Sequence, residues 1–113
     1  MYYDVIFHFD QDAEKLNVAL SNIRNYITAL QNEKFAVVLV VNGPGIKMMG
    51  KTDSQAEELT ALASLGLSVR VCQNALHHFN LKPEWLNPVC RIVPAGILEI
   101  IDLQRKGFAY IKP

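Results

Sequence analysis

The run Phe35 to Val41, FAVVLVV, constrains the fold more than any other segment, because seven apolar residues follow one another without a polar interruption. A strand with one buried face alternates apolar and polar residues. An uninterrupted apolar strand is instead typical of a parallel sheet that helices cover on both faces. The run is also far shorter than the roughly 20 residues that a membrane-spanning helix needs. We therefore expect an α/β protein with no membrane segment.

Segments with the character of strands and helices alternate along the rest of the chain. Aromatic and β-branched residues mark the strands, and apolar residues at steps of three and four mark the longest helix. The predicted strands are Tyr2 to Phe9, Phe35 to Val41, Leu67 to Cys72, Val89 to Val93 and Phe108 to Ile111. This alternation predicts a three-layer α/β/α sandwich with a five-stranded, mostly parallel sheet, formed by residues 1–113 as a single domain.

Capping residues locate the helices between these strands. Asp10 or Asp12 is expected to cap the first helix, and Ser54 begins a capping-box pattern, S-x-x-E, for the second. Asn74 is the expected N-cap of a short third helix, and a fourth runs from Ile97 to Arg105. The apolar stripe of the first helix comprises Leu16, Leu20, Ile23, Ile27 and Leu30.

Composition narrows the classes of function. Eleven basic residues balance eleven acidic ones, and Lys and Arg form no cluster. The chain therefore lacks the electrostatic pattern of a protein that binds nucleic acid or a membrane surface. The opening segment, MYYDVIFHFDQD, has none of the basic and apolar regions of a signal peptide. We expect a cytoplasmic protein whose two cysteines are reduced thiols.

Polar and glycine residues follow the apolar strands at the points where the strands end. The carboxyl ends of parallel strands share one edge of a sheet, and ligands of α/β proteins bind along that edge. The candidate pocket residues there are His8, Asn42, Gly43, Gln73, Asn74, Pro94, Ala95 and Gly96. His8 is either a base in this pocket or a polar side chain that closes it. Cys72 lies among these residues, as the last residue of its strand.

Cys72 occupies the junction between a predicted strand and a predicted helix. A thiol beside a helix N-terminus faces unpaired N–H groups and the positive end of the helix dipole, which favour the thiolate. The thiolate is the form that attacks sulfur and carries it as a persulfide. The alternative is structural, since a free cysteine is often a small buried apolar residue.

Cys90 is expected near the start of its strand, at the opposite end of the sheet from Cys72. Even on neighbouring strands, an offset of about three residues separates two cysteines by roughly 11 Å, which is too far for a disulfide. We therefore expect Cys90 to be a free, structural thiol.

The segment Gly45 to Thr52 matches the phosphate-loop pattern G-x-x-x-x-G-K-[ST], whose fixed positions here are Gly45, Gly50, Lys51 and Thr52. Two features oppose a nucleotide site. Three residues separate the pattern from its strand, and no later strand ends in an acidic residue that would hold magnesium. The alternative is a Gly-rich excursion in which Met48 and Met49 offer apolar contacts, as a lid or at a subunit interface.

Cys72, His77 and His78 are close enough in sequence to suggest a metal site. Adjacent residues on a helix point about 100° apart, so only one histidine can share a face with the thiol. Too few ligands remain for zinc, and we expect no metal.

Four segments together resemble the DsrE/DsrF family of small sulfur-handling proteins, related to the sulfur-relay subunits of tRNA thiolation. They are VIFHFD, VVLVVNGPGI, LGLSVRVCQNAL and the distinctive ending IVPAGILEIIDLQRKGFAYIKP, which cover nearly the whole chain. The resemblance implies a three-layer α/β/α fold and assembly into dimers, trimers or hexamers. It also implies that Cys72 matches the active cysteine, which in the sulfur-relay members carries a persulfide.

The leading hypothesis is a sulfurtransferase-type carrier, in which Cys72 accepts sulfane sulfur from a donor protein and passes it to an acceptor thiol. Asn74 would stabilise the developing charge, Pro94 to Gly96 would wall the pocket, and His8 would relay protons. No metal or organic cofactor is needed. The second hypothesis is a non-catalytic oligomer that binds a small ligand, and the third is nucleotide binding through Lys51 and Thr52. The high apolar content for so small a surface also predicts a homo-oligomer.

Overall fold

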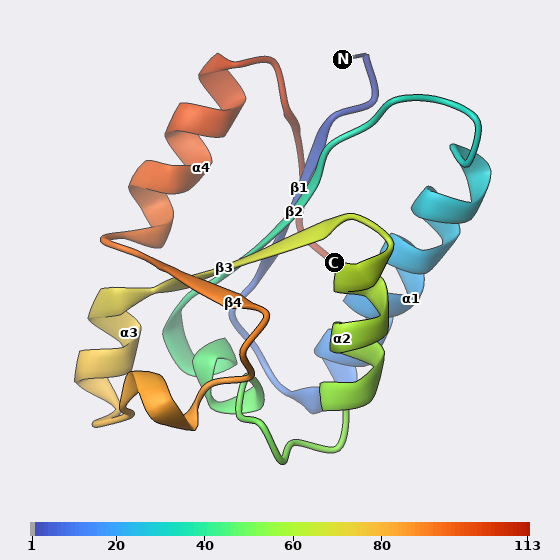
Figure 1. The fold of residues 1–113 in the computed structure, drawn as a ribbon. Coiled ribbons are helices and arrows are strands. Elements are labelled where there is room, and N and C mark those ends of the chain that lie inside the picture. The colour runs from blue at the N-terminus through green and yellow to red at the C-terminus, as the bar shows by residue number, and fades with distance from the viewer. Residues whose placement is uncertain (1) are drawn as a thin grey trace.

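The computed structural model describes residues 2–113, which form a five-stranded sheet with helices on both of its faces (Figure 1). The strands are β1 (Val5–Phe9), β2 (Val37–Val41), β3 (Leu67–Cys72), β4 (Cys90–Val93) and β5 (Ala109–Ile111). The α-helices are α1 (Ala13–Ala29), α2 (Ala56–Ser64), α3 (Gln73–His78) and α4 (Gly96–Arg105). Two 3-10 helices, η1 (Gly43–Met48) and η2 (Pro83–Trp85), lie in the connections.

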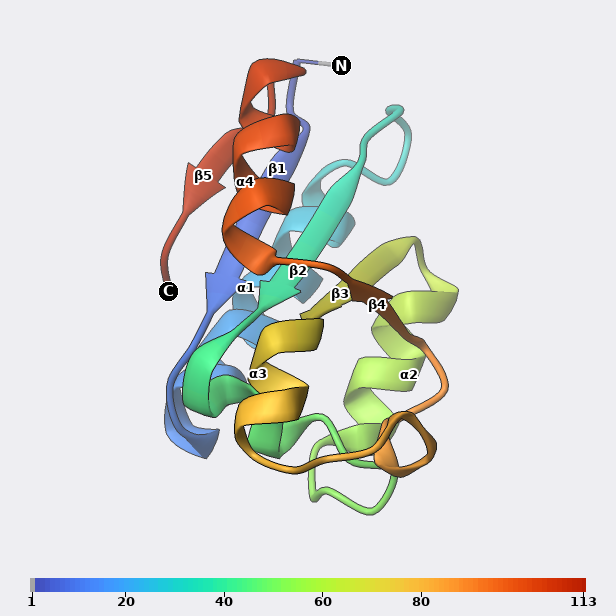
Figure 2. The same ribbon diagram turned by 90° about the vertical axis from the view of Figure 1, so that its left-hand side faces the viewer.

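The sheet has the strand order β4-β3-β2-β1-β5, and every neighbouring pair of strands is parallel. Figures 1 and 2 show α1 and α2 on one face of the sheet and α4 on the other. The predicted three-layer α/β/α sandwich is confirmed, and the sheet is parallel throughout the described residues rather than only mostly parallel.

β2 lies in the centre of the sheet and is buried on both faces, as its uninterrupted apolar sequence predicts. All five of its residues are buried. Alternate residues, beginning with Val37, belong to the larger core, which includes residues of α1 and α2. Val38 and Val40 belong to a smaller core on the other face, with Ile100 and Leu103 of α4.

Asp12 caps α1, because its Oδ1 atom accepts a hydrogen bond of 3.0 Å from the backbone N–H of Lys15. The predicted apolar stripe of this helix is buried in the larger core. Asp10, the other candidate cap, instead accepts a hydrogen bond of 2.8 Å from Nζ of Lys112. This ion pair joins the segment after β1 to the segment after β5.

The predicted caps of the second and third helices are wrong. Ser54 makes no capping bond, and α2 begins at Ala56 with Gln55 as its N-cap. The reason is a local turn, in which the carboxylate of Asp53 accepts a hydrogen bond of 3.1 Å from the N–H of Gln55. α3 begins directly at the end of β3 with Cys72 as its N-cap, so Asn74 lies in the first turn rather than at the cap.

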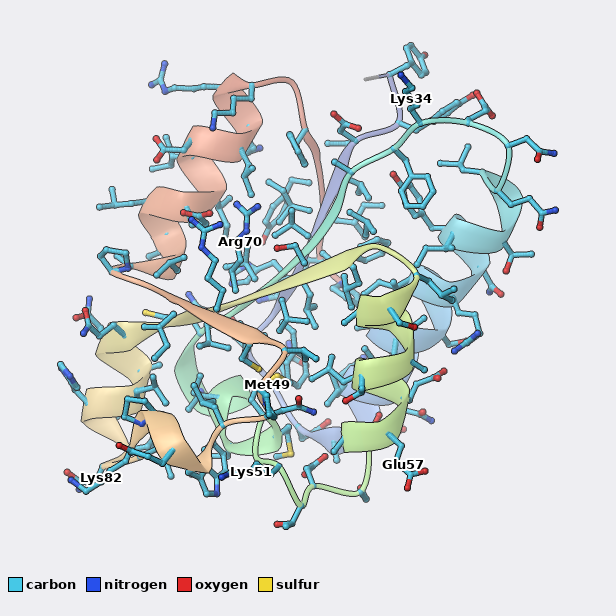
Figure 3. All side chains as sticks on the ribbon, in the orientation of Figure 1. Lys34, Met49, Lys51, Glu57, Arg70 and Lys82 are labelled. Atoms are coloured by element: carbon cyan, nitrogen blue, oxygen red, sulfur yellow. The ribbon has the colours of Figure 1, made fainter. Side chains whose placement is uncertain are left out.

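The Gly-rich segment after β2 is a compact 3-10 helix, η1, rather than an excursion. Gly43 turns the chain at the end of β2 with a φ of +53°, a conformation that glycine adopts easily. Met49 is fully buried, and Figure 3 shows it in the interior of the molecule, so the expectation that it offers surface contacts is wrong. A Cβ atom at Gly45 would lie 2.9 Å from the ring of Phe9 and 3.0 Å from Cα of Asp10.

We expect Gly45→Ala to lower the free energy of unfolding by about 1–3 kcal/mol, because the added methyl group overpacks this contact. Ser54→Ala is the control. Ser54 is exposed and caps nothing, so its substitution should change stability by less than about 0.5 kcal/mol. Urea unfolding measures both changes. A loss of about 1 kcal/mol in Ser54→Ala would instead show a working cap, and an unchanged Gly45→Ala would contradict the close packing of η1.

Candidate functional site

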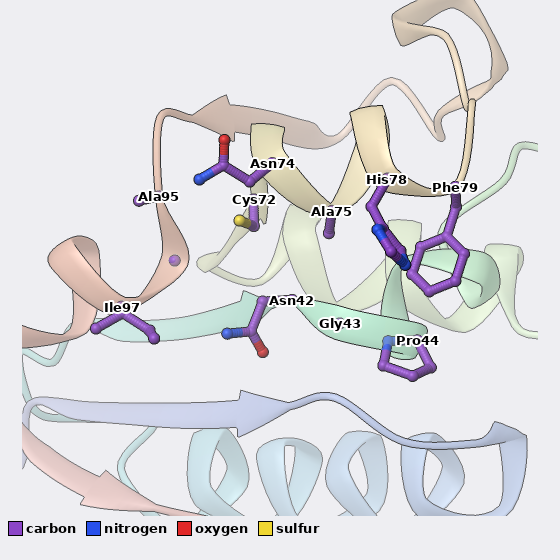
Figure 4. Close-up of a pocket in the computed structure, with 11 residues that line it drawn as sticks. Asn42, Gly43, Pro44, Cys72, Asn74, Ala75, His78, Phe79, Ala95 and Ile97 are labelled. Atoms are coloured by element: carbon purple, nitrogen blue, oxygen red, sulfur yellow. The ribbon is translucent and has the colours of Figure 1, made fainter.

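A cavity of about 540 Å³ opens at the carboxyl ends of β2 and β3, where α3 begins and α4 begins (Figure 4). Its position is the one that parallel topology predicts for a ligand site. The residues that line it are Asn42, Gly43, Pro44, Cys72, Asn74, Ala75, His78, Phe79, Ala95, Gly96 and Ile97.

The pairing of β2 with β3 brings Asn42 and Cys72 together. Val41 pairs with Val71, so the next residue of each strand lies at the same level of the sheet edge. Because side chains alternate along a strand, Cys72 and Asn42 lie on the face of the sheet that α4 covers. Figure 4 shows the two side chains on facing sides of the cavity. Cys72 is only 7% exposed, so the cavity is its main contact with solvent.

Two helix N-termini border the cavity. Cys72 is the N-cap of α3, and Ala95 is the N-cap of α4. Neither capping residue has a side chain that accepts a hydrogen bond from its helix. The first N–H groups of each helix therefore lack a capping side chain and carry partial positive charge. Since no Asp or Glu lines the cavity, this edge of the sheet favours a negatively charged group.

His8 reaches the cavity only through Asn42. Its Nε2 atom lies 2.8 Å from Oδ1 of Asn42, and its Nδ1 atom lies 2.6 Å from the hydroxyl of Tyr110. His8 itself does not line the cavity. A carboxamide does not pass protons between a base and a thiol, so the expected role of His8 as a proton relay has no geometric support.

The structure brings together most of the predicted site residues. Asn42, Gly43, Cys72, Asn74, Ala95 and Gly96 all line the cavity. Gln73 and Pro94 do not line it, and both are exposed. Each is next in sequence to a lining residue, but its side chain points elsewhere because neighbouring residues of a helix or an extended segment face different ways.

Sequence reasoning missed five lining residues: Pro44, Ala75, His78, Phe79 and Ile97. The signal for two of them was present, because His78 and Phe79 follow Asn74 and Ala75 by four residues and so share their face of α3. Of the two histidines considered as metal ligands, His78 lines the cavity and His77 does not. Within residues 2–113, no group of three His, Cys, Asp or Glu side chains is arranged to hold a metal ion.

The residues of the phosphate-loop pattern do not form a phosphate cradle. Gly45 lies inside η1, and Gly50 makes an antiparallel bridge with Leu86. The backbone N–H of Lys51 donates a hydrogen bond of 3.1 Å to the carbonyl of Trp85. Lys51 and Thr52 are exposed, and α2 begins only at Ala56. A phosphate loop needs free N–H groups that lead directly into a helix, so this geometry does not support nucleotide binding.

Cys90, unlike Cys72, does not line the cavity. Cys90 pairs with Val69, and Cys72 pairs with Val93. The two cysteines are therefore three residues apart in register, as the sequence predicts. Both thiols are free. Cys90 packs against the larger core, and this burial raises the pKa of its thiol from 9.0 to about 12. A thiol with so high a pKa stays protonated at neutral pH and is a poor nucleophile.

We expect Cys90 to make the protein lose stability at alkaline pH. The unfolded thiol ionises near pH 9.0, whereas the folded thiol keeps its proton to a pKa of about 12, so the native state binds more protons in this range. The free energy of unfolding should fall by up to about 1.4 kcal/mol for each pH unit above 9.

The comparison that isolates this effect is with Cys90→Val, which cannot ionise. Urea unfolding at pH 8, 9.5 and 10.5 should show that wild type loses more stability than the variant as pH rises. Other groups that titrate in both proteins, including Tyr26, cancel in the difference. An equal loss of stability in the two proteins as pH rises would contradict a Cys90 thiol that burial keeps protonated.

The chain matches the model of the DsrE/DsrF-like family over residues 2–113. Among solved structures it is similar to a protein of unknown function, MTH1491, from Methanobacterium thermoautotrophicum, with a TM-score of 0.92 and 27% sequence identity over 98% of this chain and 99% of that chain. It shares its fold with a protein of unknown function, BT1422, from Bacteroides thetaiotaomicron, with a TM-score of 0.74 and 13% identity over 97% and 94% of the two chains. No curated protein matches it. Among residues 2–113, no helix has the length and apolar character needed to cross a membrane.

Proposed function

The chain belongs to the DsrE/DsrF-like family, and on that premise we propose that it is a sulfur carrier that holds sulfane sulfur as a persulfide on Cys72. The observation that carries the proposal is the position of the thiol. Cys72 ends β3, is the N-cap of α3 and lines a cavity of about 540 Å³. The cavity gives a partner sulfur a route to this thiol, and a thiolate is the nucleophile in sulfur exchange.

The proposed reaction is an exchange between sulfurs that needs no added oxidant or reductant. The Cys72 thiolate attacks the outer sulfur of a donor persulfide, R–S–SH. A new S–S bond forms at Cys72, the S–S bond of the donor breaks, and the donor leaves as the thiolate R–S⁻. In the second half, an acceptor thiolate attacks the outer sulfur on Cys72 and regenerates the Cys72 thiolate. Each half conserves charge and protons.

The lining of the cavity supports this chemistry. N–H groups at the starts of α3 and α4 face a region without carboxylates, which favours the anionic sulfur species on both sides of the exchange. Apolar side chains, among them Phe79 and Ile97, line much of the remainder. A partly apolar cavity limits the access of water and of other thiols to the persulfide.

We expect a persulfide donor to add one sulfur to the wild-type protein, detected by intact mass spectrometry and mapped to Cys72. The adduct should form in Cys90→Ser, whose missing thiol lies outside the cavity, and should be absent in Cys72→Ser. A thiol acceptor added afterwards should remove the sulfur. Failure of Cys72 to gain sulfur in a folded protein would rule out the carrier.

The low exposure of Cys72 favours a second candidate function, in which the thiol is structural and the cavity binds a small ligand without reaction. The same experiment separates the two candidates. A carrier gains and loses sulfur at Cys72, whereas a binding protein leaves Cys72 unmodified.

We also propose that the chain forms a homo-oligomer through an apolar surface on α4 and β5, which lie side by side in Figure 2. This surface consists of Ile97, Leu98, Ile101 and Tyr110, of which Ile97 and Leu98 are 63% and 60% exposed. A soluble monomer rarely leaves so many large apolar side chains together in water. Ile97 also lines the cavity, so a second copy on this surface would lie next to the Cys72 site.

Sedimentation equilibrium should show a species heavier than the 12.7 kDa chain. Leu98→Glu should shift it toward the single chain, because a buried unpaired carboxylate opposes association. Val18→Glu, on the exposed face of α1, is the matched control and should leave the assembly unchanged. A wild-type protein that sediments as a monomer would contradict the proposal.

A further inference from the structure

A chain of hydrogen bonds crosses three strands and ends at the Cys72 cavity. His8 on β1 pairs in register with Val40, two residues before Asn42, and Tyr110 on β5 pairs with Ile6, two residues before His8. The three polar side chains are therefore diagonal neighbours on one face of the sheet. His8 lies between the other two, 2.6 Å from the Tyr110 hydroxyl and 2.8 Å from Oδ1 of Asn42.

The direction of these hydrogen bonds follows from the acceptor at one end. Oδ1 of Asn42 can only accept, so Nε2 of His8 carries a proton and donates it. In the neutral imidazole Nδ1 is then the acceptor, and the hydroxyl of Tyr110 donates to it. If the ring is protonated, both nitrogens donate and the bond to Asn42 is kept. The carboxamide of Asn42 has the same orientation in both charge states of His8.

This orientation leaves the NH₂ group of Asn42 for the cavity. Its Nδ2 atom has no hydrogen-bond partner within residues 2–113 and lies near Gly96, where a Cβ atom would be 3.5 Å away. Figure 4 shows the nitrogen turned toward the side of the cavity that Ile97 lines. Because Gly96 has no side chain, nothing at that position covers the amide nitrogen. The wall of the cavity that Asn42 forms thus carries a fixed hydrogen-bond donor.

We infer that His8 and Tyr110 are positioning residues that hold Asn42 as a hydrogen-bond donor, and that the cavity therefore selects sulfur compounds with an anionic group next to the reacting sulfur. This inference deepens the proposed function and rests on it for the identity of the ligand as a sulfur compound. The selection itself depends only on the geometry of the cavity. No Asp or Glu lines the cavity to oppose an anion.

The test uses two alkylating reagents of similar size and different charge, iodoacetate and iodoacetamide, on protein with the background substitution Cys90→Ser. The measured quantity is the rate constant of iodoacetate at Cys72 divided by the rate constant of iodoacetamide at Cys72. A change in thiol exposure or ionisation alters both rates alike, so it leaves the ratio unchanged. Loss of a donor to the carboxylate lowers the iodoacetate rate alone.

We expect Asn42→Leu and His8→Leu to lower the ratio by about tenfold, the usual effect of one hydrogen bond to a charged group. His8→Gln should keep the ratio, because a glutamine amide can donate to Asn42 and accept from Tyr110. Tyr110→Phe should give an intermediate loss. His77→Leu and Tyr2→Phe are the matched controls and should have no effect, since both residues are exposed and neither lines the cavity.

An unchanged ratio in Asn42→Leu and His8→Leu would overturn the inference, and so would a loss in His8→Gln equal to that in His8→Leu. A Cys72 that reacts with neither reagent would also overturn it. The outcome is separable from that of the proposed function, because alkylation requires no sulfur transfer. If the protein gains persulfide sulfur but the ratio is the same in wild type and the variants, it is a carrier without this selectivity. A protein that shows the ratio effect but gains no sulfur retains the anion-selective cavity.

Discussion

The burial of β2 on both faces is the constraint on which the rest of the structure depends. A strand without a solvent face needs helices above and below its sheet, and parallel strands need crossover connections that supply those helices. Parallel pairing in turn brings the carboxyl ends of β1, β2 and β3 to one edge. Asn42 and Cys72 become neighbours there although thirty residues separate them in sequence. The site is thus a consequence of how the core is buried.

The start of α4 is held against this edge by a partly buried ion pair. Arg70 of β3 donates to Glu99 in the first turn of α4, and its Nε atom donates a hydrogen bond of 3.2 Å to Ser68. Figure 3 shows Arg70 between β3 and α4. Desolvation offsets much of the attraction in such a pair, so its main consequence is placement. It holds Gly96, one turn from Glu99, close to Asn42.

The sequence predicts most of the fold because the signals are local. The uninterrupted run in β2 and the three-and-four spacing in α1 each determine an element without knowledge of the rest. Parallel topology then places Cys72, Asn42 and Gly96 at one edge. What could not be predicted depends on where a helix begins. Moving the start of a helix by one residue rotates its face by about 100°, and α3 begins at Gln73 rather than after Asn74.

The hydrogen bond between His8 and Asn42 was beyond sequence reasoning for a different reason. It requires the register of β1 against β2, because a shift of one residue would turn one of the two side chains to the opposite face. The sequence offers His8 as either a base in the pocket or a polar side chain that closes it, and the structure places it beside the carboxamide of Asn42 and outside the cavity lining.

The two cysteines show how strand position, rather than residue type, determines what a thiol can do. Cys72 and Cys90 lie on adjacent strands, three residues apart in register. An odd offset places them on opposite faces of the sheet. Cys90 is partly buried against the larger core, where burial raises the pKa of its thiol to about 12. Cys72 belongs to the same core but also lines the cavity beside two helix N-termini.

The slight exposure of Cys72 also limits how sulfur can be exchanged with it. A side chain that is 7% exposed is reached through the cavity and not from a flat protein surface. In the proposed transfer, a partner sulfur must enter that cavity to come within bonding distance. A small anionic persulfide does so directly, and a partner protein does so only with a cysteine on a protruding loop or chain terminus. The depth of the thiol therefore restricts the partners as strongly as its chemistry does.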